Sequence, residues 1–241
     1  MTRENFSNSF DTLLNSFAHT AQFGESNSRG DIVCDEYEKS LLLTQAQEEE
    51  ILSLYTGRNV DRESFEATEE VRRYLASLVK EAALSPISNT SGKFLGLESN
   101  SKFFTLPEDL WFITYEAALI TDGKCAGNTT LGIYPVRQDE YHRVRKNPFR
   151  GANDRRALRL DLSEGNVEII SKYSVISYYV RYLRKLKPIV LIDFDGEISI
   201  NGISGATDCE LPEILHQRIL ERAVMLALRS KGLVENNNEN R

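Results

Sequence analysis

The stretch RQDEYHRVRKNPFRGANDRRALRLDLSEGNVEIISKYSVISYYVRYLRKLK, residues 137–187, carries the clearest structural pattern in the chain. Leucines alternate with charged residues over 157–162, a Glu-Gly-Asn turn follows at 164–166, and β-branched residues resume over 167–171. Alternation on both sides of a short turn predicts a β-hairpin, and the aromatic and β-branched run at 175–183 predicts a further strand. We therefore expect a central, mainly antiparallel sheet.

Helices are expected before this sheet. Thr44 and Gln47 form a capping-box pattern, which predicts a helix that begins there and ends at Gly57. A third helix is predicted over residues 66–84, and residues 85–101 are expected to form a loop or a seam between domains. The first helix is marked by an apolar stripe at helical spacing, made of Phe6, Phe10, Leu13, Leu14 and Phe17.

Other strands and turns flank the opening stretch. Residues 111–121 and 129–136 are rich in aromatic and β-branched side chains, which predicts two strands before it. The apolar run at 189–193 predicts one strand after it. Asp-Gly at 195–196 and Asn-Gly at 201–202 are typical turn sequences, so we expect the chain to reverse at both places.

A long helix is expected near the C-terminus, with Pro212 close to its first turn and Gly232 just after its last. The predicted fold class is α+β: N-terminal helices, a central mainly antiparallel sheet and a long C-terminal helix. We expect residues 1–30 to form an N-terminal helix and linker, residues 31–233 to form one α+β domain, and residues 234–241 to be a disordered tail.

Composition points to a globular protein. Of 241 residues, 41% are hydrophobic and 27% are charged, proportions that indicate a soluble fold with a buried core. No stretch approaches the roughly 20 apolar residues that a membrane helix needs, and no signal peptide is expected. An odd number of widely spaced cysteines fits a reducing compartment and a cytoplasmic origin, and these are Cys34, Cys125 and Cys209.

No catalytic or metal site is expected. Asp193 and Asp195 follow an apolar run, as the two aspartates of haloacid-dehalogenase-like phosphatases do, but the chain has too few later residues to supply the remaining ligands. Cys209 and His216 lack a second pair at the spacing that a zinc site needs. We therefore expect a protein that is not an enzyme and has no cofactor.

Charge is distributed unevenly along the chain. Residues 137–187 hold 13 Lys and Arg against 6 Asp and Glu, a net charge of +7, whereas the rest of the chain holds 16 against 30, a net charge of −14. Seven of the cations fall within seventeen positions, and these are Arg143, Arg145, Lys146, Arg150, Arg155, Arg156 and Arg159.

Such a cluster has three interpretations. It can contact an acidic surface, on this chain or on a neighbouring copy, and repeated head-to-tail contacts of that kind close into a ring. It can bind phosphate backbones, which would make the protein a DNA-handling accessory factor without sequence specificity. It can also be a solvated surface. The N-terminal stripe of Phe6, Phe10, Leu13 and Phe17 likewise either packs on its own domain or docks on another chain.

Four blocks of the sequence resemble, in the same order, a family of virion structural proteins of tailed phages, notably the crAss-like phages. They are NFSNSFDTLLNSF with DEYEKSLLLTQAQEEEILSLY, DEYHRVRKNPFRG, YYVRYLRKLKPIVLI and CELPEILHQRILERAVMLAL. The resemblance covers about residues 5–228, and it departs from the family at Leu186, where a proline is expected.

The resemblance implies a head-to-tail connector, or tail adaptor, of a short-tailed phage. Such a protein forms a ring, usually of twelve copies, that stacks beneath the portal and extends the channel for genomic DNA. Its expected partners are further copies of itself, the portal protein, neighbouring tail or ring proteins and channel DNA, without a membrane. The expected location is the virion.

Overall fold

The computed structural model describes residues 1–21, 32–58, 64–88, 96–98, 101–121 and 129–233. Within it the chain forms two compact units. The helical unit consists of Met1–Ser77 and Leu186–Arg241, and the sheet unit consists of Leu78–Lys185. This division differs from the single domain over 31–233 that we expected, because the chain leaves the helices after Ser77 and returns only after Lys185. The expected seam at 85–101 therefore lies inside the sheet unit.

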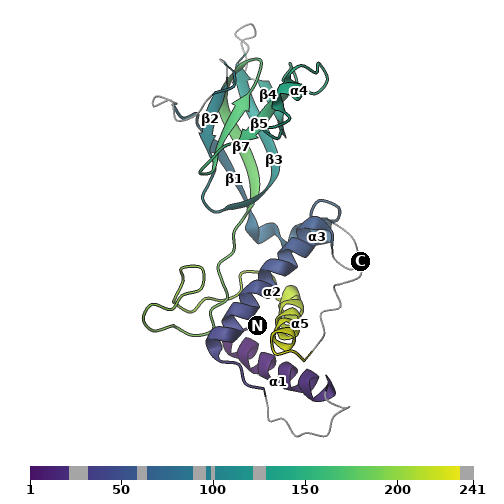
Figure 1. The fold of residues 1–241 in the computed structure, drawn as a ribbon, viewed down its shortest axis with the longest axis vertical. Coiled ribbons are helices and arrows are strands. Elements are labelled where there is room, and N and C mark those ends of the chain that lie inside the picture. Colours follow the sequence, from purple (N-terminus) through teal and green to yellow (C-terminus); the bar gives the residue numbers. More distant parts are fainter. Residues whose placement is uncertain (22–31, 59–63, 89–95, 99–100, 122–128, 234–241) are drawn as a thin grey trace. The chain divides into compact units, whose positions relative to one another are not determined.

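The helical unit contains α1 (Arg3–Ala21), α2 (Glu36–Thr56), α3 (Glu69–Tyr74) and α5 (Glu213–Ser230), with the 3₁₀ turn η1 (Ala76–Leu78) at its end. Helix α5 packs against both α1 and α2 (Figure 1). The predicted first and last helices are thus confirmed, and Gly232 ends α5 with a positive φ of 71°. Buried apolar side chains on the three long helices include Phe6, Phe10, Leu14, Leu43, Leu54, Leu215, Ile219 and Ala223.

Helix α2 begins earlier than the capping-box pattern suggested. Asp35 is its N-cap, with a side chain that accepts a hydrogen bond from the Glu38 amide at 2.6 Å. Thr44 lies in the middle of the helix and is buried, so the predicted start there is wrong. The predicted end is confirmed, since Gly57 adopts the left-handed conformation at the C-cap with φ of 73°.

The segment before α5 is held by polar side chains of α2. The hydroxyl of Thr44 accepts a hydrogen bond from the Ile189 amide and that of Ser40 accepts one from the Leu191 amide, each at 3.0 Å. Because these side chains occupy the backbone groups, residues 189–193 form only a single bridge, between Val190 and Thr207, and the predicted strand is wrong. Buried backbone groups are here satisfied by side chains instead of a neighbouring strand.

Both predicted turns occur in this segment. Gly196 has a φ of 76°, and Asn201 and Gly202 have φ of 50° and 80°, the pair of positive values that a tight reversal requires. The Phe194 amide donates to the Ser204 carbonyl at 2.8 Å across the reversal. We call residues 190–207 the arm.

The described part of the sheet unit holds seven strands in the order β1-β7-β3-β4-β5-β6-β2. All neighbouring pairs are antiparallel except β4 and β5, which are parallel and are joined through α4 (Tyr141–Arg145). The predicted mainly antiparallel sheet is confirmed. The strands are β1 (Val79–Leu84), β2 (Lys102–Thr105), β3 (Leu110–Thr121), β4 (Thr129–Pro135), β5 (Arg156–Asp161), β6 (Asn166–Ile170) and β7 (Ser174–Arg184).

The hairpin at the centre of the sequence is β5–β6, and Glu164 and Gly165 have positive φ values of 57° and 68° at its turn. The predicted third helix is correct only at its start. It ends at Tyr74, and residues 79–84 instead form β1, which pairs with β7 along its whole length. Ladder hydrogen bonds with a distant strand override the local helical pattern there.

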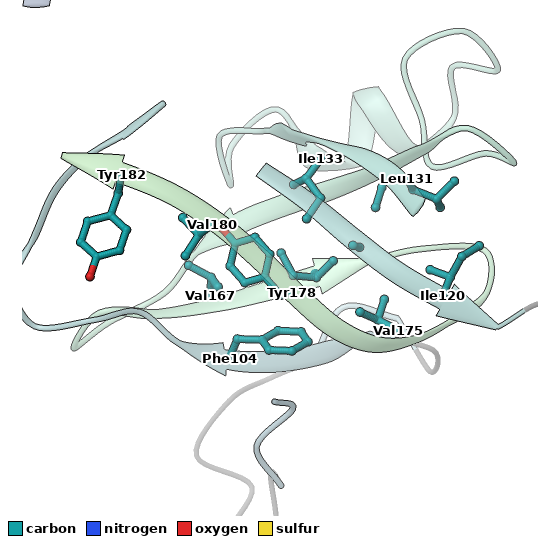
Figure 2. Close-up of a cluster of buried hydrophobic side chains, with 12 residues drawn as sticks. Phe104, Ile120, Leu131, Ile133, Val167, Val175, Tyr178, Val180 and Tyr182 are labelled. Atoms are coloured by element: carbon teal, nitrogen blue, oxygen red, sulfur yellow. The ribbon is translucent and has the colours of Figure 1, made fainter. Parts of the chain in front are cut away.

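The sheet curls so that its two edges approach each other. Ile87, just after β1, forms an antiparallel bridge with Phe103 of β2, and its amide donates to the Phe103 carbonyl at 2.8 Å. Figure 2 shows the apolar side chains gathered inside the curl, with the rings of Phe104 and Tyr178 edge to face at 5.5 Å. Most of the apolar burial in this unit is therefore on one face of the sheet.

A smaller apolar cluster lies on the opposite face of β5 and β6. Tyr141 and Val144 of α4 pack there against Leu158 and Leu160 of β5. Because side chains alternate along a strand, Ala157 and Arg159 face the inside of the curl. Helix α4 and the loop that follows it are thus fixed to the sheet by Leu158 and Leu160.

Candidate assembly surface

The loop after α4 is folded tightly on itself. The side-chain oxygen of Asn147 accepts hydrogen bonds from the amides of Phe149, at 2.9 Å, and Arg150, at 3.2 Å. The Gly151 amide donates to the Asn147 carbonyl at 2.8 Å, and a Cβ at Gly151 would lie only 2.9 Å from that oxygen. A side chain at position 151 would therefore disturb the turn.

The second half of the loop is braced to the sheet. The side-chain oxygen of Asn153 accepts a hydrogen bond from the Arg155 amide at 2.9 Å. Arg156, at the start of β5, donates to the Phe149 carbonyl at 2.8 Å, and its guanidinium stacks over the Tyr134 ring at 4.2 Å from the centroid. These contacts fix the loop backbone, so its outward side chains are held in place before any partner arrives.

Four of the seven predicted cations are engaged within the sheet unit. Arg145 pairs with Glu98 at 2.6 Å, and Arg143 lies 3.4 Å from Glu140. Arg156 braces the loop, as described, and Arg159 is buried. The other three are exposed and form no ion pair with any residue that the structure describes, and they are Lys146, Arg150 and Arg155.

Arg159 lies in the interior of the sheet and not on the predicted contact surface. Its side chain is 10% exposed, and its Nη1 is 2.7 Å from a carboxylate oxygen of Glu116, whose other oxygen accepts from the Tyr178 hydroxyl at 2.8 Å. The Arg159 Nε is 3.0 Å from Asp161, although neither of these nitrogens makes a well-directed hydrogen bond. Strand alternation places Arg159 beside Ala157, facing inward, so it is unavailable to a partner.

Burial changes the titration of this interior cluster. Loss of water raises the pKa of the Glu116 carboxyl, and the nearby Arg159 charge opposes that rise. Burial, followed by the negative charge of Glu116, raises the pKa of the Tyr178 hydroxyl. The three side chains act as a structural unit in the core of the sheet.

Phe149 is the feature of this surface that the sequence-based reasoning missed. Its side chain is 82% exposed, between the braced backbone of Asn147 and the unpaired cation Arg150. An exposed aromatic ring on a fixed loop is typical of the residues that dominate protein interfaces. The Asn-Pro-Phe-Arg-Gly sequence at 147–151 was the available signal, since it combines turn residues with one large apolar side chain. We call residues 146–155 the basic loop.

The two units carry opposite charges. The sheet unit holds 16 Lys and Arg against 12 Asp and Glu, a net charge of +4, and the helical unit holds 13 against 24, a net charge of −11.

A family model described as phage tail ring protein 3/4 matches residues 1–239.

This chain belongs to the phage tail ring protein 3/4 family.

Two curated relatives come from Bacteroides phage crAss001. The chain is 45% identical to the protein named Ring protein 3, over 99% of this chain and 100% of that protein. It is 30% identical to the protein named Ring protein 4/5, over 94% of this chain and 92% of that protein. The resemblance to structural proteins of crAss-like phages is thus confirmed, and this tail ring protein has a structural role in the phage particle.

The N-terminal stripe of this tail ring protein faces its own helical unit. Phe6 and Phe10 are fully buried, and the Phe6 ring lies 5.2 Å from that of His216 on α5. Leu13 is half-buried, whereas Phe17 is 41% exposed. Docking of α1 on another chain through Phe6 and Phe10 would therefore require the helix to leave its place on α5, and only Phe17 presents a large surface to solvent.

The residues considered for chemistry have structural surroundings. The Asp193 carboxylate accepts a hydrogen bond from the Ala206 amide at 2.7 Å across the arm, and Asp195 is exposed at the turn. The Cys209 thiol faces Gln47 at 3.4 Å, and His216 lies 2.9 Å from the Leu211 carbonyl. Among the described residues no cluster of His, Cys, Asp or Glu could hold a metal ion. No described helix is long and apolar enough to cross a membrane.

Proposed function

We propose that this tail ring protein forms a ring in the head-to-tail connector below the portal and extends the channel through which DNA passes. Family membership over residues 1–239 supports the ring, and the names of both crAss001 relatives include the word ring. Twelve copies, to match the portal, are the expected number. Its partners are then other copies, the portal and adjacent ring or tail proteins, with virion assembly following synthesis in the host cytoplasm.

The opposite charges of the two units carry this proposal. A ring of identical chains uses one heterologous contact repeated around an axis, so each copy needs two different surfaces that complement each other. A sheet unit of +4 and a helical unit of −11 provide such a pair. Like surfaces repel and unlike surfaces attract, which favours contact between the sheet unit of one copy and the helical unit of another.

The basic loop is the part of the sheet unit best suited to this contact. Its three unpaired cations and the exposed Phe149 stand on a backbone that is already ordered, so little conformational entropy is lost on binding. Arg143 and Arg145 are less suited to bind an acidic partner, because each already forms an ion pair, with Glu140 and Glu98 respectively. We therefore narrow the proposed interface from the seven predicted cations to Lys146, Arg150 and Arg155.

Particle size tests the ring directly. The purified chain, alone and mixed with its portal protein, is examined by analytical ultracentrifugation and negative-stain electron microscopy. We expect a fast-sedimenting species that appears as a closed ring. A chain that remains monomeric at high concentration, even with portal present, would contradict the proposal.

A second measurement separates protein contact from DNA contact at the basic loop. Arg150→Glu with Arg155→Glu reverses two exposed charges without touching the loop's backbone contacts. Loss of the ring is expected if the loop contacts another subunit. Loss of DNA retention with an intact ring would instead assign these cations to the channel, where phosphate is the partner.

A further inference from the structure

The arm, residues 190–207, is a feature of the helical unit whose tip, residues 195–199, is exposed. Its base is fixed to α2 by Ser40 and Thr44, and it is closed on itself by the Phe194–Ser204 hydrogen bond. The Phe194 ring also packs edge to face on Tyr37 at 5.5 Å. Figure 1 shows the arm leaving the helices as a loop that folds back on itself. It is therefore an anchored projection.

The arm carries negative charge only. Residues 190–207 contain three carboxylates and no Lys or Arg, and the carboxylates are Asp193, Asp195 and Glu197. Asp195 and Glu197 at its tip are exposed and have no hydrogen-bond or ion-pair partner among the residues that the structure describes. Two isoleucines of the arm are also exposed, Ile192 at 48% and Ile198 at 51%.

We infer that the arm of one copy docks on the basic loop of the next copy. This rests on the proposed ring, and it names the two surfaces that meet in it. The arm offers unpaired carboxylates beside exposed isoleucines, and the loop offers unpaired cations beside the exposed Phe149. Each surface thus combines exposed apolar side chains with charged ones, and the charges have opposite signs on the two surfaces; apolar and charged groups together are usual in protein interfaces.

A closed ring requires that each copy carry both of the surfaces that meet. The arm belongs to the helical unit and the basic loop to the sheet unit, so every copy carries one of each. When each arm binds the loop of the following copy, all arms and loops around the ring are occupied. The same two surfaces cannot pair arm to arm or loop to loop, because like charges would face each other.

Two charge-reversal variants test the inference. The arm variant carries Asp195→Lys and Glu197→Lys, and Asp193 is kept because its carboxylate holds the Ala206 amide. The loop variant carries Arg150→Glu and Arg155→Glu. Each variant alone brings like charges together at every contact, so we expect the ring species to be lost in sedimentation. An equal mixture of the two is expected to restore it, since copies of the two variants alternate and every contact again joins opposite charges.

A matched control changes the same amount of charge elsewhere. Glu4→Lys with Glu48→Lys alters two exposed carboxylates of α1 and α2, outside the arm, and is expected to leave the ring intact. Circular dichroism checks that all variants fold. Because the arm tip is exposed, a milder variant with Asp195→Asn and Glu197→Gln is expected to weaken the ring without loss of folding.

The outcomes separate the inference from the function on which it rests. Restoration by the mixture supports the contact between copies. If only a chain that carries all four reversals assembles, and the mixture does not, the arm meets the loop of its own chain and the inference is overturned. An arm variant that assembles like the control also overturns it, while the ring stands. A wild-type chain that forms no ring refutes the proposed function itself.

Discussion

Replacing the buried Arg159 is the sharpest test of which basic residues in 137–187 belong to the core and which to the surface. In Arg159→Met, a long apolar side chain replaces the guanidinium, and Glu116 keeps its charge inside the sheet with only the Tyr178 hydroxyl as a donor. Both partners of the ion pair are about nine-tenths buried, with side-chain exposures of 10% and 8%. The variant therefore creates an uncompensated buried carboxylate.

The expected cost follows from that burial. Removing one partner of a buried pair typically destabilises a protein by about 3 to 5 kcal/mol. With a urea dependence of about 2 kcal/mol per M for a domain of this size, the unfolding midpoint should fall by about 2 M. The matched control is Arg155→Met, an exposed and unpaired position, where the change should stay within about 0.5 kcal/mol.

Trp111 makes the assay specific for the sheet unit. It is the only tryptophan of the chain and lies in β3, where its ring stacks on Phe112 at 4.9 Å. Tryptophan fluorescence in urea therefore follows unfolding of the sheet unit, whatever the helical unit does. Adding Glu116→Gln to Arg159→Met removes the unpaired charge and keeps an acceptor for Tyr178, so most of the lost stability should return.

Equal midpoints for Arg159→Met and Arg155→Met would refute the reasoning. Such a result would mean that Arg159 is as solvated as Arg155 and that it belongs with the surface cations after all. A failure of Glu116→Gln to restore stability would point instead to lost packing of the arginine stem as the main cost.

Three further predictions concern residues that stabilise the arm, the basic loop and the sheet unit. Thr44→Val leaves the buried amide and carbonyl of Ile189, at the base of the arm, without their side-chain partner. The free energy of unfolding of the helical unit, followed by circular dichroism, should fall by about 1 to 3 kcal/mol. The control Thr12→Val changes an exposed threonine and should cost little. Gly151→Ala forces a Cβ to 2.9 Å from a carbonyl oxygen and should lower sheet-unit stability by about 1 to 3 kcal/mol; an unchanged urea midpoint would contradict the tight turn. The Lys80 hydrogen bond lowers the pKa of Asp109, so the folded state favours the carboxylate and this stability is lost as pH falls through that lowered pKa. Lys80→Met should therefore start acid unfolding of the sheet unit at a higher pH by Trp fluorescence, and identical acid curves would refute the link.

The elements that sequence could predict are those decided by neighbours in the chain. The β5–β6 hairpin depends on alternation and on a Glu-Gly turn, and α5 depends on its apolar period and on Gly232. The predicted helix over 66–84 failed in its second half because pairing with β7, about a hundred residues later in the chain, decides the conformation of β1. The predicted strand at 189–193 failed because Ser40 and Thr44 of a distant helix take its backbone groups.

Some features of the candidate surface could likewise be predicted from the sequence, and others could not. Net charge located the basic loop, since charge can be counted without a fold. Burial of Arg159 could not be predicted, because both faces of β5 are covered and the usual alternation of apolar and polar residues does not say which face is the inner one. The exposure of Phe149 was hidden for the opposite reason, since a phenylalanine is by default expected in a core.

The pairing of cations inside the sheet unit has a consequence for how the ring holds together. After Arg143, Arg145, Arg156 and Arg159 are engaged, three cations of the predicted cluster are left for a partner. Exposed ion pairs are worth roughly 0 to 1 kcal/mol each, and salt screens them beyond about 8 Å at physiological ionic strength. In the proposed contact, three such pairs would select and orient a neighbour but would not hold it. The affinity would then come from apolar contact, and Phe149 is the large apolar side chain that the basic loop exposes.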